Sequence, residues 1–141
     1  MDGGREQDQV GAHDSVLVFD EETAVLDFVA LALSKAGYQV TSTRRRDEAL
    51  RLFSGRTFDL AIADLGLHNE NGRRLVLEIK ATNPQTAVVS MAAYPAGEIE
   101  AFAEQHTEAF LAKPFDMSEL LAAVRSVLGR RSSTEPAGAV S

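Results

Sequence analysis

The 141-residue chain contains no cysteine, which excludes disulfide bonds and thiolate metal sites and fits a reducing compartment. Basic residues are also few, since 14 lysines and arginines stand against 21 aspartates and glutamates and leave a net charge of −7. Electrostatic binding to the nucleic-acid backbone requires a basic protein surface. We therefore expect no direct binding to nucleic acid.

Long apolar runs are absent as well. The most apolar stretch, residues 24–36, is interrupted by Asp27 and Ser34, so it is too short and too polar to span a bilayer. The N-terminal residues lack the apolar core of a secretion signal. These absences predict a cytoplasmic protein without a membrane segment. The remaining composition, with 45% hydrophobic and 25% charged residues, is typical of a soluble globular domain.

What the chain does contain is a five-fold alternation of apolar runs and helical periodicity. Strands are predicted at residues 16–19, 38–43, 58–63, 86–92 and 109–112. Helices are predicted at residues 23–36, from Thr43 or Asp47 to 54, and at 73–81, 98–105 and 117–128. Because the connections are short and each crossover is right-handed, this order predicts an α/β fold with a doubly wound parallel sheet.

Local signals place the ends of the folded region. Gly37 stands where a left-handed cap ends a helix, and Asp116 with Glu119 forms a capping box before the last helix. Residues 1–13 and 130–141 are polar and are predicted to be a disordered N-terminal segment and a disordered C-terminal tail. A single domain at residues 14–129 is expected between them.

The apolar run from residue 58 to 63 ends on Asp64 and then breaks into polar residues and glycines. A strand buried on both faces has no place for an unpaired carboxylate in its middle, so Asp64 is expected at the carboxyl end. In open α/β sheets this end is where ligands collect. The alternative is that Asp64 only caps the following turn.

Two other strand ends carry charges. Asp20 and Glu21 end the first strand, and Lys113 follows the fifth. If the first and third strands are neighbours, both acids crowd Asp64 and repel one another unless a cation lies among them. Such oxygen ligands suit Mg²⁺, and a lysine supplies a point charge for a phosphoryl group. The chemistry that fits these residues is phosphoryl transfer onto a carboxylate. The alternative is that Glu21 and Glu22 are only acids at a helix N-terminus and that Lys113 is only a surface lysine.

Three segments resemble the signature blocks of two-component receiver domains. They are VLVFDEE (residues 16–22), DLAIADLGLHNENG (59–72) and FLAKPF (110–115), and the resemblance extends over residues 15–128. It implies a flavodoxin-like fold with five parallel strands in the order 2-1-3-4-5 and five helices, in three α/β/α layers. It also implies that Asp64 is the phosphoacceptor, served by a histidine kinase or a histidine phosphotransfer protein.

The same resemblance assigns the surrounding residues. Asp20 and Glu21, with Asp64 and the Gly66 carbonyl, match the groups that hold Mg²⁺. Lys113 matches the lysine that pairs with the phosphoryl group. The bond from Lys113 to Pro114 is expected to be cis, and Phe110 falls at the aromatic switch position.

Some positions depart from the family pattern. The family places a threonine or serine at the end of the fourth strand, and the matching residue here is Ala92, with Ser90 as the alternative. Loss of that hydroxyl forfeits about 1.5–3 kcal/mol of charge-assisted hydrogen bonding, comparable to a coupling free energy of about 1–3 kcal/mol. Glu21 replaces the commoner aspartate, and His68 stands where proline is frequent.

The sequence thus predicts a stand-alone receiver that is not an enzyme beyond self-phosphorylation and self-dephosphorylation. Its output is expected to be contact with a downstream protein through the fourth helix, fifth strand and fifth helix, where a homodimer could also form. The alternative is a degenerate receiver that acts as a phosphorylation-independent interaction module. A phosphatase is disfavoured because Leu65 and Gly66, not a second acid, follow Asp64.

Overall fold

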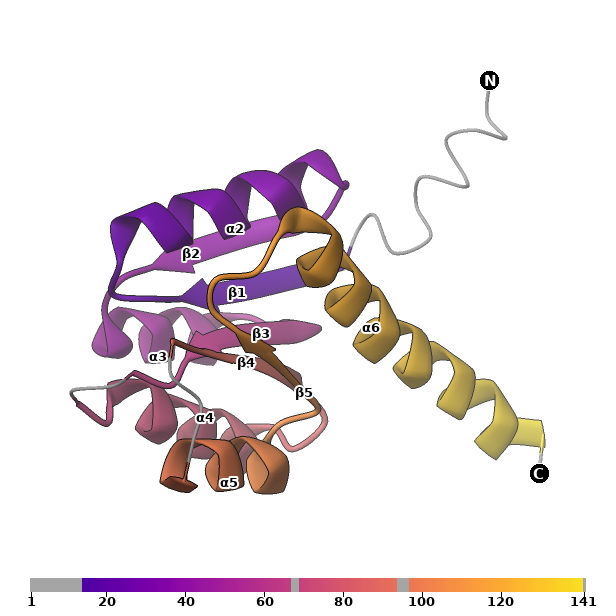
Figure 1. Ribbon diagram of the computed structural model, residues 1–141. Coiled ribbons are helices and arrows are strands. Elements are labelled where there is room, and N and C mark those ends of the chain that lie inside the picture. Colours follow the sequence, from indigo (N-terminus) through magenta and orange to yellow (C-terminus); the bar gives the residue numbers. More distant parts are fainter. Residues whose placement is uncertain (1–13, 67–68, 94–96, 141) are drawn as a thin grey trace.

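The computed structural model describes residues 14–66, 69–93 and 97–140, with side chains as far as Arg130. Within these residues, five parallel strands form one sheet in the order β2-β1-β3-β4-β5. Helices cover both faces of the sheet and give three α/β/α layers (Figure 1). The predicted fold class and strand order are confirmed. No helix in the described ranges is long and apolar enough to cross a membrane.

The observed elements lie close to the predicted ones. The strands are β1 (Ser15–Phe19), β2 (Gln39–Thr43), β3 (Leu60–Asp64), β4 (Ala87–Ala92) and β5 (Ala109–Ala112). The helices are α2 (Thr23–Lys35), α3 (Arg46–Gly55), α4 (Asn71–Thr82), α5 (Gly97–His106) and α6 (Met117–Val140). The fourth and fifth helices of the sequence prediction are therefore α5 and α6.

The C-terminal end differs from the prediction. The backbone of α6 is helical to Val140, beyond residue 130 where the disordered tail is predicted to begin. A single glycine costs a helix only about 1 kcal/mol, so Gly129 does not end α6. The predicted disorder of residues 1–13 lies outside the described residues.

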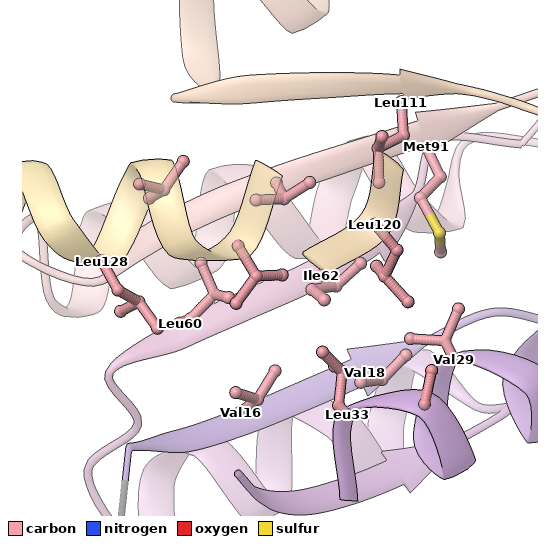
Figure 2. Packing of buried hydrophobic residues seen from close by; sticks show 14 of the residues in the cluster. Val16, Val18, Val29, Leu33, Leu60, Ile62, Met91, Leu111, Leu120 and Leu128 are labelled. Carbon is pink, nitrogen blue, oxygen red and sulfur yellow. The ribbon is translucent and has the colours of Figure 1, made fainter. Parts of the chain in front are cut away.

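Apolar side chains bury both faces of the sheet. Val16 and Val18 of β1 face one cluster, which α2 and α6 cover, as Figure 2 shows. Leu17 and Phe19 of the same strand face a second cluster, to which α3, α4 and α5 contribute. Successive side chains of a strand point to opposite faces, so a strand covered on both sides is apolar throughout. This explains why charged residues collect at the strand ends.

Both predicted caps are present. Gly37 follows α2 with φ of 101°, in the left-handed region that favours glycine. At the start of α6, the Asp116 N–H donates to Glu119 Oε1 at 2.9 Å, and the Glu119 N–H donates to Asp116 Oδ1 at 2.8 Å. This reciprocal pair is the predicted capping box.

The close approach of α4 to β3 holds the end of β3 in place. Gly72 lies in the first turn of α4, and a Cβ atom built on it would lie 1.7 Å from the Asp64 carbonyl oxygen. No other residue type fits this position without a backbone shift. The Leu65 N–H donates to the Met91 carbonyl at 2.8 Å, which continues the pairing of β3 with β4 past Asp64. The backbone of Asp64 is thereby held on two sides.

Replacing Gly72 by alanine tests this contact. We expect Gly72→Ala to lower the free energy of unfolding by about 3 kcal/mol or more, because the added methyl group collides with backbone rather than with a side chain. Gly129→Ala, at an exposed position of α6, is the matched control, since nothing lies within 4 Å of its built Cβ. It should raise stability by roughly 0.5–1 kcal/mol. Urea denaturation of the two variants measures both effects, and equal stabilities would contradict the proposed contact.

Candidate functional site

Three sequence-predicted residues meet at the carboxyl end of the sheet. Asp20 follows β1, Asp64 ends β3 and Lys113 follows β5. The Lys113 Nζ atom lies 2.8 Å from Asp20 Oδ2 and 3.0 Å from Asp64 Oδ1. Strand pairing explains the meeting, because Phe19 of β1 is in register with Ala63 of β3. The residues after those two positions are therefore neighbours.

The side chain of Lys113 is nearly buried and lies among three carboxylates. Its side chain is 9% exposed, and its Nζ atom also lies 2.9 Å from Glu22 Oε1. Burial acts to lower the pKa of Lys113, but the bonds to Asp20, Glu22 and Asp64 outweigh burial and raise this pKa above its ordinary value. The ammonium group therefore stays charged at neutral pH.

The Asp64 carboxylate lies at the surface of this charged cluster, whereas that of Asp20 lies inside it. The side chain of Asp64 is 13% exposed, whereas that of Asp20 is completely buried. Burial and the nearby charge of Asp20 raise the pKa of Asp64, while the bond to Lys113 opposes the rise. The folded state therefore disfavours the charged form of Asp64, although part of its side chain reaches solvent.

Glu21 and Glu22 face different partners. Glu21 Oε1 accepts a hydrogen bond from Asn69 Nδ2 at 3.0 Å, and Glu21 Oε2 accepts one from Asn71 Nδ2 at 2.8 Å. The bonds from Asn69 and then Asn71 lower the pKa of Glu21. Glu22, and not Glu21, is therefore the third acid on Lys113. The sequence predicts only a helix-terminal role for Glu22, since no local pattern shows which of two adjacent side chains turns inward.

The donor set fits a magnesium ion. Asp20 and Asp64 supply carboxylate oxygens, and three carboxylates against the single ammonium of Lys113 leave an excess of negative charge. Gly66 adopts φ of 77°, and a Cβ there would lie 2.9 Å from the Asn69 carbonyl oxygen. Among the described residues, no group of three or more acidic or histidine side chains is arranged to hold a metal ion. Ligation by Glu21 requires it to turn from Asn69, and stays a prediction.

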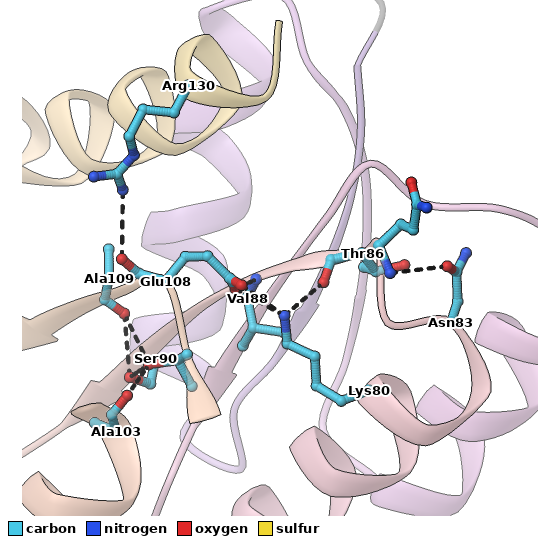
Figure 3. Close-up of polar contacts among 11 residues, drawn as sticks. Lys80, Asn83, Thr86, Val88, Ser90, Ala103, Glu108, Ala109 and Arg130 are labelled. Atoms are coloured by element: carbon cyan, nitrogen blue, oxygen red, sulfur yellow. Dashed lines mark hydrogen bonds and ion pairs between the residues drawn. The ribbon is translucent and has the colours of Figure 1, made fainter. Parts of the chain in front are cut away.

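The end of β4 carries no hydroxyl toward Asp64. Ala92 is buried, and its carbonyl accepts the Lys113 N–H at 2.8 Å. The Ser90 hydroxyl lies 3.0 Å from Thr107 Oγ1 and donates to the Ala109 carbonyl at 3.2 Å, which ties β4 to the start of β5 (Figure 3). Ser90 is thus engaged elsewhere, which favours Ala92 as the position of the missing hydroxyl.

The remaining predicted residues lie near β5. Phe110 is half-buried and packs against the cluster that α5 helps to cover. The bond from Lys113 to Pro114 is cis, as predicted. The predicted switch role of Phe110 stays a prediction, and His68 lies outside the described residues.

The raised pKa of Asp64 predicts a pH-dependent stability difference. The folded state disfavours ionised Asp64, so this group stabilises the fold below its unfolded pKa and loses that contribution as pH rises through its folded pKa. Without divalent ions at pH 7, Asp64→Asn should therefore be more stable than the wild type. The difference should shrink as pH falls and Asp64 becomes protonated. Urea denaturation between pH 7 and pH 4 measures it, and a less stable variant at pH 7 would contradict it.

Comparison with known proteins places this chain in a family. Residues 16–125 match the model of the response regulator receiver domain. The DNA-binding transcriptional regulator NtrC of Azospirillum brasilense is 31% identical over 125 residues, which cover 87% of this chain and 25% of that protein. NtrC of Bradyrhizobium sp. (strain RP501 Parasponia) is 34% identical over 115 residues, which cover 81% and 24%. The chain therefore spans about a quarter of the length of these relatives.

Solved structures of receiver domains share the fold of this chain. The signal receiver domain of an HD domain-containing protein from Pseudomonas fluorescens Pf-5 superposes with a TM-score of 0.80 at 27% identity, over 91% of this chain and 96% of that one. A CheY-like receiver domain protein from Methanospirillum hungatei JF-1 shares the fold, with a TM-score of 0.81 at 24% identity over 86% and 98%. This chain belongs to the response regulator receiver domain family of two-component signalling proteins.

Proposed function

We propose that this chain accepts a phosphoryl group on Asp64 from the phosphohistidine of a histidine kinase or a histidine phosphotransfer protein. The observation that carries the proposal is a partly exposed Asp64 carboxylate flanked by the buried Asp20 and Lys113. An Asp64 oxygen bonds to phosphorus while the phosphorus–nitrogen bond of the donor breaks. The electron pair of that bond goes to the imidazole, which takes up a proton.

Lys113 stabilises the transferred group in this proposal. Its ammonium, already 3.0 Å from Asp64 Oδ1, donates to a phosphoryl oxygen and offsets the charge that develops there. Receiver domains generally bind Mg²⁺ at their acidic pocket, where it neutralises the phosphoryl oxygens. Asp20, Asp64, Glu21 and the Gly66 carbonyl would hold it here. The chain then acts as a phosphoacceptor with at most self-phosphorylation and self-dephosphorylation activity, not as an enzyme.

A protein donor is supported by the surface beside Asp64. A cleft of about 440 Å³ lies between α2 and the loop after β5, and Glu22 and Lys113 form part of its wall. The rest of its lining is largely apolar, and the ring of Phe28 is exposed there, 6.2 Å from that of Phe115. An exposed aromatic surface beside the acceptor gives a donor protein a place to pack.

The output is proposed to use α5, β5 and α6. A groove of about 310 Å³ between α5 and β5 is lined by Glu100, Glu104 and Glu108, with Ala103 and Phe110 among its apolar residues. Like charges four residues apart on a helix, as at Glu100 and Glu104, are unfavourable by about 0.2–0.5 kcal/mol. A basic segment of a downstream protein offsets that repulsion. A homodimer through this face would bring two acidic grooves together, so we favour a different protein as partner.

Several finer expectations stay predictions. The relatives are DNA-binding regulators of which this chain spans about a quarter, so the absence of nucleic-acid binding has no support from them. A cytoplasmic location is proposed on the composition and pattern of the sequence alone.

Phosphorylation can be tested with acetyl phosphate and Mg²⁺. Intact-mass measurement should show the gain of one phosphoryl group on the wild type and none on Asp64→Asn, because the attacking oxygen is lost. Asp27→Asn, which removes an exposed acid of α2, is the matched control and should be modified like the wild type. Modification of Asp64→Asn to the wild-type extent would overturn the assignment.

A second candidate is a phosphorylation-independent interaction module, and the missing hydroxyl at Ala92 favours it. With beryllofluoride and Mg²⁺, we expect NMR resonances around Asp64 to shift while those of Phe110 change little. Ala92→Ser should restore a shift at Phe110, since the added hydroxyl supplies a bond of about 1.5–3 kcal/mol. A full Phe110 shift in the wild type would show that the readout does not need this hydroxyl.

A further inference from the structure

Glu22 is the acid of this site that the proposed transfer leaves without a role. Its Oε1 atom lies 2.9 Å from Lys113 Nζ, although 66% of its side chain is exposed. Glu22 stands at the N-cap position of α2, but its side chain caps no backbone N–H there. The carboxylate instead reaches a residue 91 positions away in the chain. A purely helix-terminal role does not account for that contact.

Three carboxylates share the ammonium of Lys113. An ammonium group has three N–H donors and no acceptor. Its Nζ atom has three carboxylate partners, in Asp20 at 2.8 Å, Glu22 at 2.9 Å and Asp64 at 3.0 Å. A phosphoryl group on Asp64 takes over the contact that Lys113 makes with Asp64. It presents three charged oxygens in place of the one carboxylate oxygen that Lys113 now contacts. The Glu22 contact of Nζ has hydrogen-bond geometry, whereas Asp20 Oδ2 accepts no hydrogen bond, so a phosphoryl oxygen that draws the ammonium toward itself competes with Glu22.

Of the two remaining partners, only Glu22 is free to leave. Asp20 is completely buried, and its Oδ1 accepts the backbone N–H of Glu22 at 2.9 Å. Moving Asp20 would bury an unpaired charge and break that bond, which is costly. Glu22 can swing into water at little cost, because an exposed ion pair is worth only about 0.2–1 kcal/mol.

We propose that Glu22 is a positioning residue that covers the Lys113 ammonium from the solvent side and competes with the incoming phosphoryl group for it. Phosphorylation of Asp64 then releases Glu22. Because Glu22 begins α2 and lines the cleft beside Phe28, its release alters the surface of that cleft. This change requires no hydroxyl at Ala92. The inference rests on the proposed phosphoryl transfer to Asp64.

Phosphorylation kinetics separate competition from a general charge effect. With acetyl phosphate and Mg²⁺ at low ionic strength, Glu22→Gln should raise the initial rate about 1.4- to 5-fold, the factor that corresponds to one exposed ion pair. Glu22→Asp keeps the charge but shortens the side chain, and should also raise the rate if the direct bond matters. Asp27→Asn is the charge-matched control on the same helix and should behave like the wild type.

Each contrary result has a definite meaning. A wild-type rate for Glu22→Gln overturns the inference and leaves the phosphoacceptor proposal intact. An equal rise in Asp27→Asn also overturns it, because the effect would then come from net charge. A wild type that acetyl phosphate never modifies overturns both proposals.

A direct measurement follows the Glu22 carboxylate itself. Its side-chain ¹³C resonance, identified by its absence from Glu22→Gln, should move on addition of beryllofluoride and Mg²⁺ to the value of a freely exposed glutamate. If resonances around Asp64 shift while that of Glu22 does not, Lys113 has kept its contact with Glu22 and the proposed release is wrong.

Discussion

The ammonium of Lys113 is the group on which the charged end of the sheet depends. It balances Asp20, which is completely buried, together with Asp64 and Glu22 at distances of 2.8–3.0 Å. Without this cation, two neighbouring carboxylates would lie at the end of an apolar sheet, with the desolvation cost and repulsion that this entails. The same balance prepares the site for a phosphoryl group, since one cation is already held where new negative charge arrives.

The parallel strand order creates that meeting. With β1 and β3 adjacent at the point where the winding reverses, the residues after Phe19 and Ala63 become neighbours. Lys113 arrives from the edge strand β5, and its backbone N–H continues the pairing with Ala92. Gly72 lets α4 approach the carbonyl of Asp64 closely. The acceptor is thus held by its backbone and remains open on its side-chain face.

The missing hydroxyl at Ala92 affects the readout of phosphorylation and not the acceptor itself. Asp20, Asp64 and Lys113 form a compact charged group, whereas Ala92 offers no hydroxyl beside it. Ser90 has its hydroxyl tied to Thr107 and does not replace it. In the arrangement we infer, Glu22 supplies the group that moves, and the consequence of phosphorylation would be felt at α2 in addition to α5 and β5.

The sequence by itself determined the alternation of elements, both helix caps and the presence of Asp20, Asp64 and Lys113 at strand ends, because these depend on local periodicity and on the cost of burying charge. Which strand ends become neighbours depends on the order of the strands in the sheet. Local sequence pattern does not encode that order, and here it was predicted from the resemblance to a family. Only the tertiary structure decided that Glu22 turns to Lys113 and Glu21 to Asn69. Adjacent side chains of one type differ only in the distant residues they meet after folding.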